Sequence, residues 1–189
     1  MKYCSECGKA VEHKIPEGDD RLRHICTRCN IIHYHNPRVI VGCLISQGEQ
    51  VLLCRRAIEP RKNYWTIPAG FLENGETMLH GALRESQEEA CAEVDNESLY
   101  RLFDIPYINQ VYVFYRGELR GNHYGIGPES LEVKLFDEKD IPWSELAFPV
   151  VTDLLTEYFQ DRKSGNFPVR VEQPGPLWAE HTGWSNKPR

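Results

Sequence analysis

The sequence lacks any apolar run close to the roughly 20 residues that a helix needs to cross a bilayer. Its first ten residues, MKYCSECGKA, also lack the apolar core and the cleavage site of a secretory signal peptide. Both absences favour a protein of the cytoplasm with no membrane partner. In that reducing compartment, the seven cysteines are not expected to form a disulfide framework.

A positive charge balance is missing as well. The chain has 22 Lys and Arg against 28 Asp and Glu, which gives a formal net charge of −6. Proteins that bind nucleic acid usually carry an excess of basic residues for the phosphate backbone. Nucleic acid is therefore a disfavoured partner, although the composition allows a local basic patch. Internal repeats and low-complexity segments are also absent, and 189 residues suffice for one main domain with a small accessory unit.

Two pairs of cysteines set residues 1–36 apart from the rest of the chain. Cys4 and Cys7 form one Cys-x2-Cys pair, Cys26 and Cys29 form the other, and eighteen residues separate the pairs. Two such pairs can close a tetrahedral site around one Zn²⁺ ion. Four thiolates saturate the ion, so the zinc would be structural; the alternative is four free or redox-active cysteines. We predict a zinc ribbon over residues 1–36 whose folding depends on the metal.

Residues 37–164 have a mixed α/β pattern. Strands are expected at 39–45 and 50–56, joined by the turn sequence SQGE, and at 98–105, 110–119 and 132–137. Helices are expected at 77–91, with Thr77 as the N-cap, and at 149–162. The segment 64–77 is expected to be a loop punctuated by Gly and Pro, and residues 165–189 are expected to form a Pro-rich tail.

The first of these helices carries three glutamates on one face. Glu85, Glu88 and Glu89 are spaced three and four residues apart, so their carboxylates should converge. Like charges at this spacing destabilise a helix by roughly 0.2–0.5 kcal/mol per pair. One interpretation is a solvated acidic face relieved by Arg84. The other is a site for a hard cation, Mg²⁺ or Mn²⁺, because carboxylate oxygens are the ligands such ions prefer.

The loop before the helix favours the cation site. Residues 70–92 fit the pattern G-x5-E-x7-R-E-U-x-E-E-x-G-U, in which U is a bulky aliphatic residue. The matching residues are Gly70, Glu76, Arg84, Glu85, Glu88 and Glu89. This pattern resembles the signature of the Nudix hydrolases, and the strand–strand–loop–helix order around it is similar too. Ser86 and Cys91 stand where the family usually has an aliphatic residue and a glycine, so we expect effects on packing and helix termination.

The resemblance implies a fold and a reaction. The fold would be a mixed sheet between helices, an α/β/α sandwich over residues 37–164. The reaction would be hydrolysis of a nucleoside diphosphate linked to another moiety, with a divalent metal assisting the attack of water. The implied metal ligands are the carbonyl of Gly70 and the carboxylates of Glu85, Glu88 and Glu89. Arg84 would orient these carboxylates through charge-assisted hydrogen bonds, together with Glu76.

Further catalytic and binding residues lie outside the signature. A glutamate from another loop serves as general base in several family members, which leaves Glu129 and Glu132 as equal candidates here. The Gly/Pro-rich start of their segment, GIGPES, suggests a mobile loop that closes over substrate. For the substrate, Arg55 or Arg56 could hold the pyrophosphate. The aromatic residues that could stack on a base, or else serve in packing, are Trp65, Tyr107 and Tyr112.

The ribbon narrows the expected substrates. A zinc ribbon before this domain resembles the NADH pyrophosphatase group, but the SQPWPFPxS array of that group is absent. Residues 30–150 are instead similar to a ribbon-bearing subgroup that includes plant plastid FAD pyrophosphatases. That similarity implies cleavage of FAD to FMN and AMP, or of ADP-ribose to AMP and ribose 5-phosphate, and by analogy a homodimer. NADH and NAD-capped RNA are alternative substrates, and a non-catalytic nucleotide sensor or nucleic-acid-binding protein is the alternative of another class.

Overall fold

The computed structural model describes residues 1–173, which form two compact units, one of residues 1–36 and one from Pro37 onward. The part of the expected tail that contains Trp178 and Trp184 lies outside the described residues. Within them, no helix combines the length and the apolar character that a membrane crossing requires.

The first unit is a small antiparallel sheet. Its strands lie in the order β1-β2-β3, and they are β1 (Val11–Lys14), β2 (Arg23–Cys26) and β3 (Ile32–His33). Few of its side chains are buried, and among the hydrophobic ones only Cys4, Ile25 and Cys26 are. A unit with so little core cannot be held together by apolar burial alone, so another source of stability is required.

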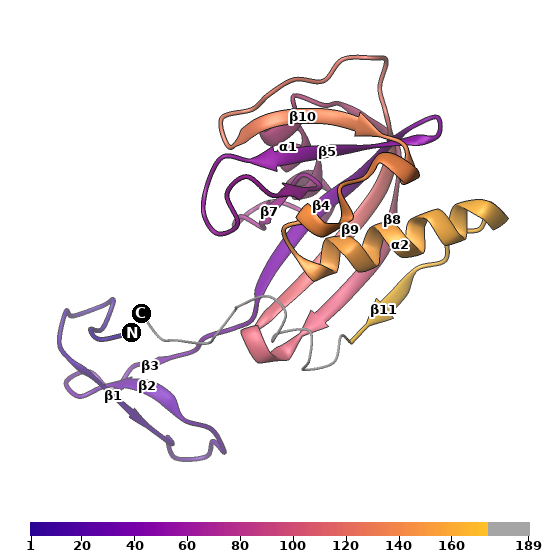
Figure 1. Cartoon of the computed structure of the whole chain (residues 1–189). Helices are drawn as coiled ribbons and strands as arrows, with labels where there is room; N and C mark the ends of the chain where they lie inside the picture. The colour runs from indigo at the N-terminus through magenta and orange to yellow at the C-terminus, as the bar shows by residue number, and fades with distance from the viewer. Residues whose placement is uncertain (174–189) are drawn as a thin grey trace. The chain divides into compact units, whose positions relative to one another are not determined.

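The second unit is built on one mixed sheet (Figure 1). Its long strands are β4 (Arg38–Gln47), β5 (Gln50–Arg56), β8 (Val94–Ile105), β9 (Gln110–Leu119) and β10 (Ser130–Phe136). The sheet order is β10-β5-β4-β9-β8-β11, where β11 is Arg170–Glu172. The short strands β6 (Trp65–Thr66) and β7 (Ala69–Phe71) pair with β5 and β4. Since β4 runs parallel to β9 and β11 parallel to β8, while the other pairs are antiparallel, the sheet is mixed as expected.

Two helices cover opposite faces of this sheet. Neighbouring residues of β5 alternate between two apolar clusters: Leu53 joins the cluster that includes Leu154 and Leu155 of α2 (Pro149–Ser164), and Leu52 the cluster that includes Ala82 of α1 (Met78–Ala90). Alternate residues of a strand face opposite sides of the sheet, so α1 and α2 lie on different faces. Figure 1 shows the same arrangement, with α2 in front of the strands and α1 behind them. The α/β/α sandwich is therefore confirmed.

Three local predictions need correction. The segment 64–77 was expected to be a loop, but it contains β6 and β7. Strand β8 starts at Val94, four residues before the expected start, through irregular pairing around Asn96, whose φ is 56°. The start of the expected tail contains β11, which extends the sheet beyond β8. All three errors concern short or irregular pairing that depends on neighbours distant in sequence, which local residue preferences do not encode.

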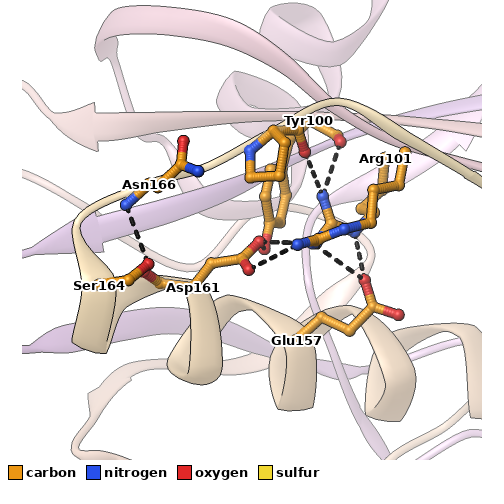
Figure 2. Close-up of polar contacts among 8 residues, drawn as sticks. Tyr100, Arg101, Glu157, Asp161, Ser164 and Asn166 are labelled. Atoms are coloured by element: carbon orange, nitrogen blue, oxygen red, sulfur yellow. Dashed lines mark hydrogen bonds and ion pairs between the residues drawn. The ribbon is translucent and has the colours of Figure 1, made fainter.

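A buried network of charges fastens β11 to the sheet (Figure 2). The Arg101 side chain on β8 is fully buried and donates to Asp161 at 2.7 Å, to Glu157, and to the carbonyl oxygen of Pro168 at 2.7 Å. Asp161 on α2 also accepts from Arg170 of β11 at 2.8 and 3.0 Å. One carboxylate thus joins the strand, the helix and the C-terminal segment.

Candidate functional site

Helix α1 begins and ends through identifiable capping contacts. The Thr77 hydroxyl accepts a hydrogen bond from the amide of His80 at 3.2 Å, which confirms the expected N-cap. At the other end, Cys91 takes the left-handed conformation with φ of 48°, and Ala92 donates to the carbonyl oxygen of Ser86 at 3.2 Å. The helix therefore ends as it would with glycine, at a conformational cost of about 1 kcal/mol for a residue that has a side chain.

Ser86 occupies a fully buried position on α1. Its hydroxyl donates to the carbonyl oxygen of Ala82 at 2.8 Å, so the polar group is satisfied inside the helix. The serine therefore replaces an aliphatic side chain without leaving an unpaired polar atom in the core.

Strand β7 approaches the glutamate face of α1 closely. A Cβ atom at Gly70 would lie 2.3 Å from the Glu85 carboxylate, so a side chain at this position would displace Glu85. The neighbouring Ala69 amide donates to the Glu89 carboxylate at 3.1 Å. Glu85 and Glu89 are only 9% and 6% exposed. The loop that precedes the helix thus folds back and covers two carboxylates with backbone.

Arg84 makes contacts with three glutamates. Its guanidinium donates to Glu76 at 2.8 and 3.0 Å, to Glu85 at 2.7 Å and to Glu88 at 2.9 Å. A fifth bond reaches the carbonyl oxygen of Phe71 at 3.1 Å. This guanidinium holds the pKa of Glu76 at about 2. The ion pair of Arg84 with Glu76, expected from the sequence, joins the helix to the loop before it.

The three helix carboxylates do not form one compact group. Glu88 is exposed and its carboxylate is bonded to Arg84, whereas Glu85 and Glu89 are buried beside β7. Within residues 1–173, the only set of three or more His, Cys, Asp or Glu ligand atoms within 4.8 Å of one another belongs to four cysteines. The expected convergence of the three carboxylates is thus only partly present, because the Arg84 guanidinium stands between Glu85 and Glu88.

Burial makes the two covered carboxylates poor anions. It raises the pKa of Glu89 to about 8, and nearby Glu85 and Glu129 raise it further, against the lowering effect of the Ala69 amide. Burial also raises the pKa of Glu85, partly opposed by Arg84. Two adjacent acids in this state gain from a cation that offsets both charges.

A cavity of about 730 Å³ lies over this face of α1. Eight of the residues predicted for the metal, catalytic and substrate sites line it: Arg56, Gly70, Arg84, Glu85, Glu88, Glu89, Tyr112 and Glu129. The remaining lining comes from several strands, from the start of α2 and from the loops between them, and it is mostly apolar. The cavity therefore combines an acidic part with an apolar one, which suits a ligand with both polar and ring-shaped portions.

Four predicted residues lie elsewhere. Arg55 and Glu132 face each other across β5 and β10, 3.8 Å apart, and neither lines the cavity. Trp65 is buried with its ring 4.9 Å from that of Phe136, and Tyr107 packs against the same apolar cluster. Both rings thus contact the apolar core outside the cavity, the position expected from the alternative to stacking on a base.

The segment that carries Glu129 is fastened to the helix. Gly125 donates to the carbonyl oxygen of Ala90 at 2.7 Å, and Gly127 donates to that of Glu89 at 3.2 Å. Gly127 therefore has a reason other than the mobility expected from the sequence: a Cβ atom there would lie 1.8 Å from the carbonyl oxygen of Glu88, so only glycine allows the segment to approach the last turn of α1 this closely.

The four cysteines of the small unit form a separate site. Sulfur atoms of Cys7 and Cys26 lie 3.5 Å apart, and those of Cys4 and Cys7 lie 3.7 Å from that of Cys29. A tetrahedron of sulfurs about 2.3 Å from Zn²⁺ has edges of about 3.8 Å. The geometry therefore fits the predicted zinc site.

The two Cys-x2-Cys segments, or knuckles, of this site have the same backbone conformation. Gly8 donates to the carbonyl oxygen of Cys4 and Asn30 to that of Cys26, at 3.0 and 3.1 Å, and both take positive φ values, 70° and 56°. Asn30 is the counterpart of Gly8, and its part in the second knuckle was not predicted, although asparagine is the residue that tolerates this conformation best after glycine.

Sequence reasoning also missed polar and aromatic residues of the cavity over α1, notably Gln110 and Phe148. Gln110 opens β9, and Phe148 is the residue before α2. Neither belongs to a motif, and only the tertiary fold brings β9 and the start of α2 to the cavity that the glutamates of α1 also line.

Comparisons with known proteins agree with this geometry. Residues 36–154 match the NUDIX domain family, and residues 2–35 match the family described as Nudix N-terminal, a zinc ribbon. The chain belongs to the Nudix family. A crystal structure of a NUDIX hydrolase from Nitrosomonas europaea is 47% identical, with a TM-score of 0.87, and the match covers 92% of this chain and 100% of that one.

Two named relatives are more distant. The NAD-capped RNA hydrolase NudC of Pectobacterium carotovorum subsp. carotovorum is 25% identical over 130 residues, 69% of this chain and 48% of the relative. The ADP-ribose pyrophosphatase of Methanocaldococcus jannaschii is 29% identical over 122 residues, 61% of this chain and 69% of the relative. The chain thus spans about half the length of that NudC protein.

Proposed function

We propose that this protein is a divalent-metal-dependent pyrophosphohydrolase that cleaves a nucleoside diphosphate linked to another moiety. The observation that carries the proposal is the pair of buried carboxylates, Glu85 and Glu89, covered by the backbone of Ala69 and Gly70 at the wall of a large cavity. A stable protein gains nothing from two adjacent buried acids of raised pKa. A cation bound between them would offset the charge of both carboxylates and so account for the arrangement.

The residues present fit such a cation. Glu85 accepts a hydrogen bond from Arg84 and Glu89 accepts one from the Ala69 amide, and the remaining lone pairs of both carboxylates can serve as ligands beside the carbonyl of Gly70. Glu88 would join them after leaving Arg84. When bound, Mg²⁺ or Mn²⁺ supplies charge that stabilises the diphosphate and activates water for attack. Oxygen ligands suit both ions, and we propose Mg²⁺ as the first to test.

The chain's own residues supply the other roles. Arg84 holds Glu85 in place through the bond described above, and it holds Glu88 only until that carboxylate joins the cation. Glu129, rather than Glu132, is proposed as the general base, because only Glu129 lines the cavity. Arg56, rather than Arg55, is proposed to hold the diphosphate for the same reason, and its guanidinium lies 5.3 Å from the ring of Phe148.

The first substrates to test are FAD and ADP-ribose. Support for ADP-ribose comes from the relative that is named an ADP-ribose pyrophosphatase, and support for FAD from the resemblance in the sequence over residues 30–150. NADH and NAD-capped RNA are the second choice, favoured by the NudC relatives. An apolar cavity lining with Tyr112 and Phe114 suits the ring that all four substrates share, adenine.

The remaining proposals concern zinc, compartment and assembly. We propose that zinc in the four-cysteine site is structural, because four sulfurs leave no open position. All seven cysteines are free of disulfides, which supports a reducing compartment such as the cytoplasm. A homodimer is proposed by analogy alone and is checked by light scattering on the purified chain.

The proposal is tested by assaying FAD, ADP-ribose, NADH and NAD-capped RNA with Mg²⁺ or Mn²⁺ and resolving the products. We expect hydrolysis of at least one, and a loss of two or more orders of magnitude in Glu89→Gln and Glu129→Gln at unchanged stability. Glu132→Gln is the matched control, because that carboxylate is bonded to Arg55 outside the cavity. No turnover of any substrate would defeat the enzyme, and equal losses in Glu129→Gln and Glu132→Gln would defeat the assignment of the base.

A further inference from the structure

The apolar part of the cavity contains one deeply buried amide. Gln110 is 3% exposed and lines the cavity among Ile40, Phe114, Phe148 and Val151. These neighbours belong to, or pack against, the apolar cluster under α2, whereas the glutamates come from α1 on the other face of the sheet. A ligand that reaches from the glutamates into this part of the cavity therefore meets Gln110 as a polar group in an apolar wall.

The Gln110 amide is bonded on one side only. Its oxygen accepts a hydrogen bond from the Tyr112 hydroxyl at 3.0 Å. Among residues 1–173, its NH₂ group has no hydrogen-bond partner. The group is not completely enclosed by protein, and the residue lines the cavity. A buried amide without a partner costs about 1–3 kcal/mol. The NH₂ group is therefore available to a ligand in the cavity.

Tyr112 determines which end of the amide is available. The tyrosine is buried, and burial raises the pKa of its hydroxyl to about 12, so the hydroxyl keeps its proton at neutral pH. A protonated hydroxyl beside the amide oxygen holds that oxygen away from the cavity and leaves the two N–H donors as the exposed face. The pair thus presents a donor and no acceptor.

The position of Arg56 connects this donor to the reacting part of the site. Arg56 lines the same cavity and lies over the ring of Phe148. Its charge acts on both the Glu89 carboxylate and the Tyr112 hydroxyl. A diphosphate held by Arg56 and the glutamates would therefore have its attached nucleoside beside Tyr112 and Gln110.

We infer that Gln110, positioned by Tyr112, determines substrate specificity by donating a hydrogen bond to an acceptor atom on a heteroaromatic ring bound in the apolar part of the cavity. The ligand class is a nucleotide whose ring carries an imine nitrogen or a carbonyl oxygen. The effect of Gln110 on catalysis rests on the proposed function, because it requires that the protein hydrolyses the bound nucleotide. Recognition of the ring is a property of binding, so it can be tested without turnover.

The test compares Gln110→Met, which keeps the length of the side chain but removes its donors, with Tyr112→Phe and the double variant. Binding of AMP, FMN and ribose 5-phosphate is measured by calorimetry with Mg²⁺ present. We expect wild type to bind at least one ring-bearing nucleotide more tightly than ribose 5-phosphate, and Gln110→Met to weaken it about tenfold, the factor that 1.4 kcal/mol represents. Ribose 5-phosphate, which has no heteroaromatic ring, should bind all variants equally.

Tyr112→Phe should weaken nucleotide binding by a smaller factor, because the freed amide can turn its oxygen toward the ring. In the double variant Tyr112→Phe should add nothing to Gln110→Met, since no amide remains to be positioned. Gln50→Met is the control for the substitution itself: Gln50 bonds to Asp137 at 3.3 Å and does not line the cavity. In turnover assays the loss in Gln110→Met should fall mainly on KM.

Three results would overturn the inference. They are equal weakening of AMP and ribose 5-phosphate in Gln110→Met, unchanged binding of every nucleotide in that variant, and no preference of wild type for any ring-bearing nucleotide. A preference that depends on Gln110 in a protein that hydrolyses nothing would instead uphold the inference and defeat the proposed function. The thermal midpoint of each variant is measured in parallel, so that a folding defect is recognised.

Discussion

Gly127 lies directly against the carbonyl group of Glu88 at the end of α1. A Cβ atom at Gly127 would come within 1.8 Å of the Glu88 carbonyl oxygen, and the Gly127 amide donates to the next carbonyl, that of Glu89, at 3.2 Å. The atoms in contact are backbone atoms on both sides, so an added side chain could be accommodated only by moving the segment or the helix. Because Glu129 follows two residues later, this contact sets the distance between the proposed base and the glutamates of the helix.

Gly127→Ala should therefore reduce activity through position rather than chemistry. The added methyl group must push the segment away from α1, which costs about 1–3 kcal/mol of unfolding free energy. It also moves Glu129 away from the carboxylates. We expect kcat/KM for the hydrolysed substrate to fall at least tenfold, measured with Mg²⁺, while urea denaturation reports the stability loss.

Gly125→Ala is the matched control for this substitution. A Cβ atom at Gly125 would meet the side chain of Cys91 at 3.5 Å, which is ordinary van der Waals contact. We expect its stability to stay within about 0.5 kcal/mol of wild type and its activity to stay near normal. Equal losses in the two alanine variants would contradict the role assigned to the Gly127 contact.

Cys91→Gly should stabilise the protein. Cys91 holds a left-handed conformation with φ of 48°, which glycine adopts without the steric cost of a side chain. We expect the unfolding free energy to rise by about 1 kcal/mol, which corresponds to about 2–4 °C in Tm for a chain of this length. Differential scanning calorimetry with the zinc concentration held fixed measures it.

The comparison with Cys91→Ala separates conformation from side-chain contacts. Alanine removes the thiol but keeps the cost of the left-handed backbone. Its stability should therefore equal or fall below that of wild type, while glycine exceeds both. Equal stability of the alanine and glycine variants would show that the thiol, and not the backbone, sets the stability at this position.

The glutamate face of α1 could be predicted from the sequence because it rests on local spacing. Glu85 and Glu89 share a face in any α-helix, and the contacts of Arg84 follow from one turn of helix and the preceding loop. The separation of Glu88 from the buried pair was missed, since its cause is the position of the guanidinium. A side-chain conformation of that kind has no signal in residue spacing.

The choice within each pair of candidates could not be predicted, because it depends on pairing between distant strands. Arg55 and Arg56 are neighbours on β5, so they point to opposite sides of the sheet and only one can face the cavity. Register decides which: Arg55 lies opposite Glu132 of β10, with a shift in pairing between Ser130 and Glu132. The same register leaves Glu129 in the cavity and takes Glu132 out of it.

Cys7→Ser should unfold the small unit and leave the larger one folded. Because residues 1–36 have few buried side chains, we expect them to depend on the metal for much of their folding free energy. We expect one equivalent of zinc in wild type and a large loss in the variant, measured by elemental analysis. Amides of β1 and β2 should lose protection from hydrogen exchange, while those of β4 and β9 keep it.

Ser5→Ala is the control in the same knuckle, because Ser5 is exposed and carries no thiol. It should retain zinc and hydrogen-exchange protection. Retention of zinc by Cys7→Ser would mean that Cys7 is dispensable as a ligand, and an unfolded second unit would mean that the two units depend on each other.

The last prediction concerns Asp161 and acid. Hydrogen bonds from Arg170, and next from Arg101 and Tyr100, hold the pKa of Asp161 at about 2, below its usual 3.8. The unfolded chain therefore binds this proton more readily than the folded one. The stability from the ionised carboxylate is present above about pH 4 and is lost as the pH falls toward 2, in total about 2 kcal/mol.

Asp161→Asn should lower stability at neutral pH and flatten this acid dependence, because asparagine has no proton to gain. Within residues 1–173, the network of Figure 2 would then leave the buried guanidinium of Arg101 with Glu157 as its only carboxylate partner. Hydrogen exchange of β11 and α2 amides is measured at pH 5, 4 and 3. These amides report on the second unit alone, so a loss of zinc from the ribbon in acid does not affect the result. Parallel pH curves for wild type and variant would contradict the assignment, since a residue that does not titrate on unfolding cannot change their slope.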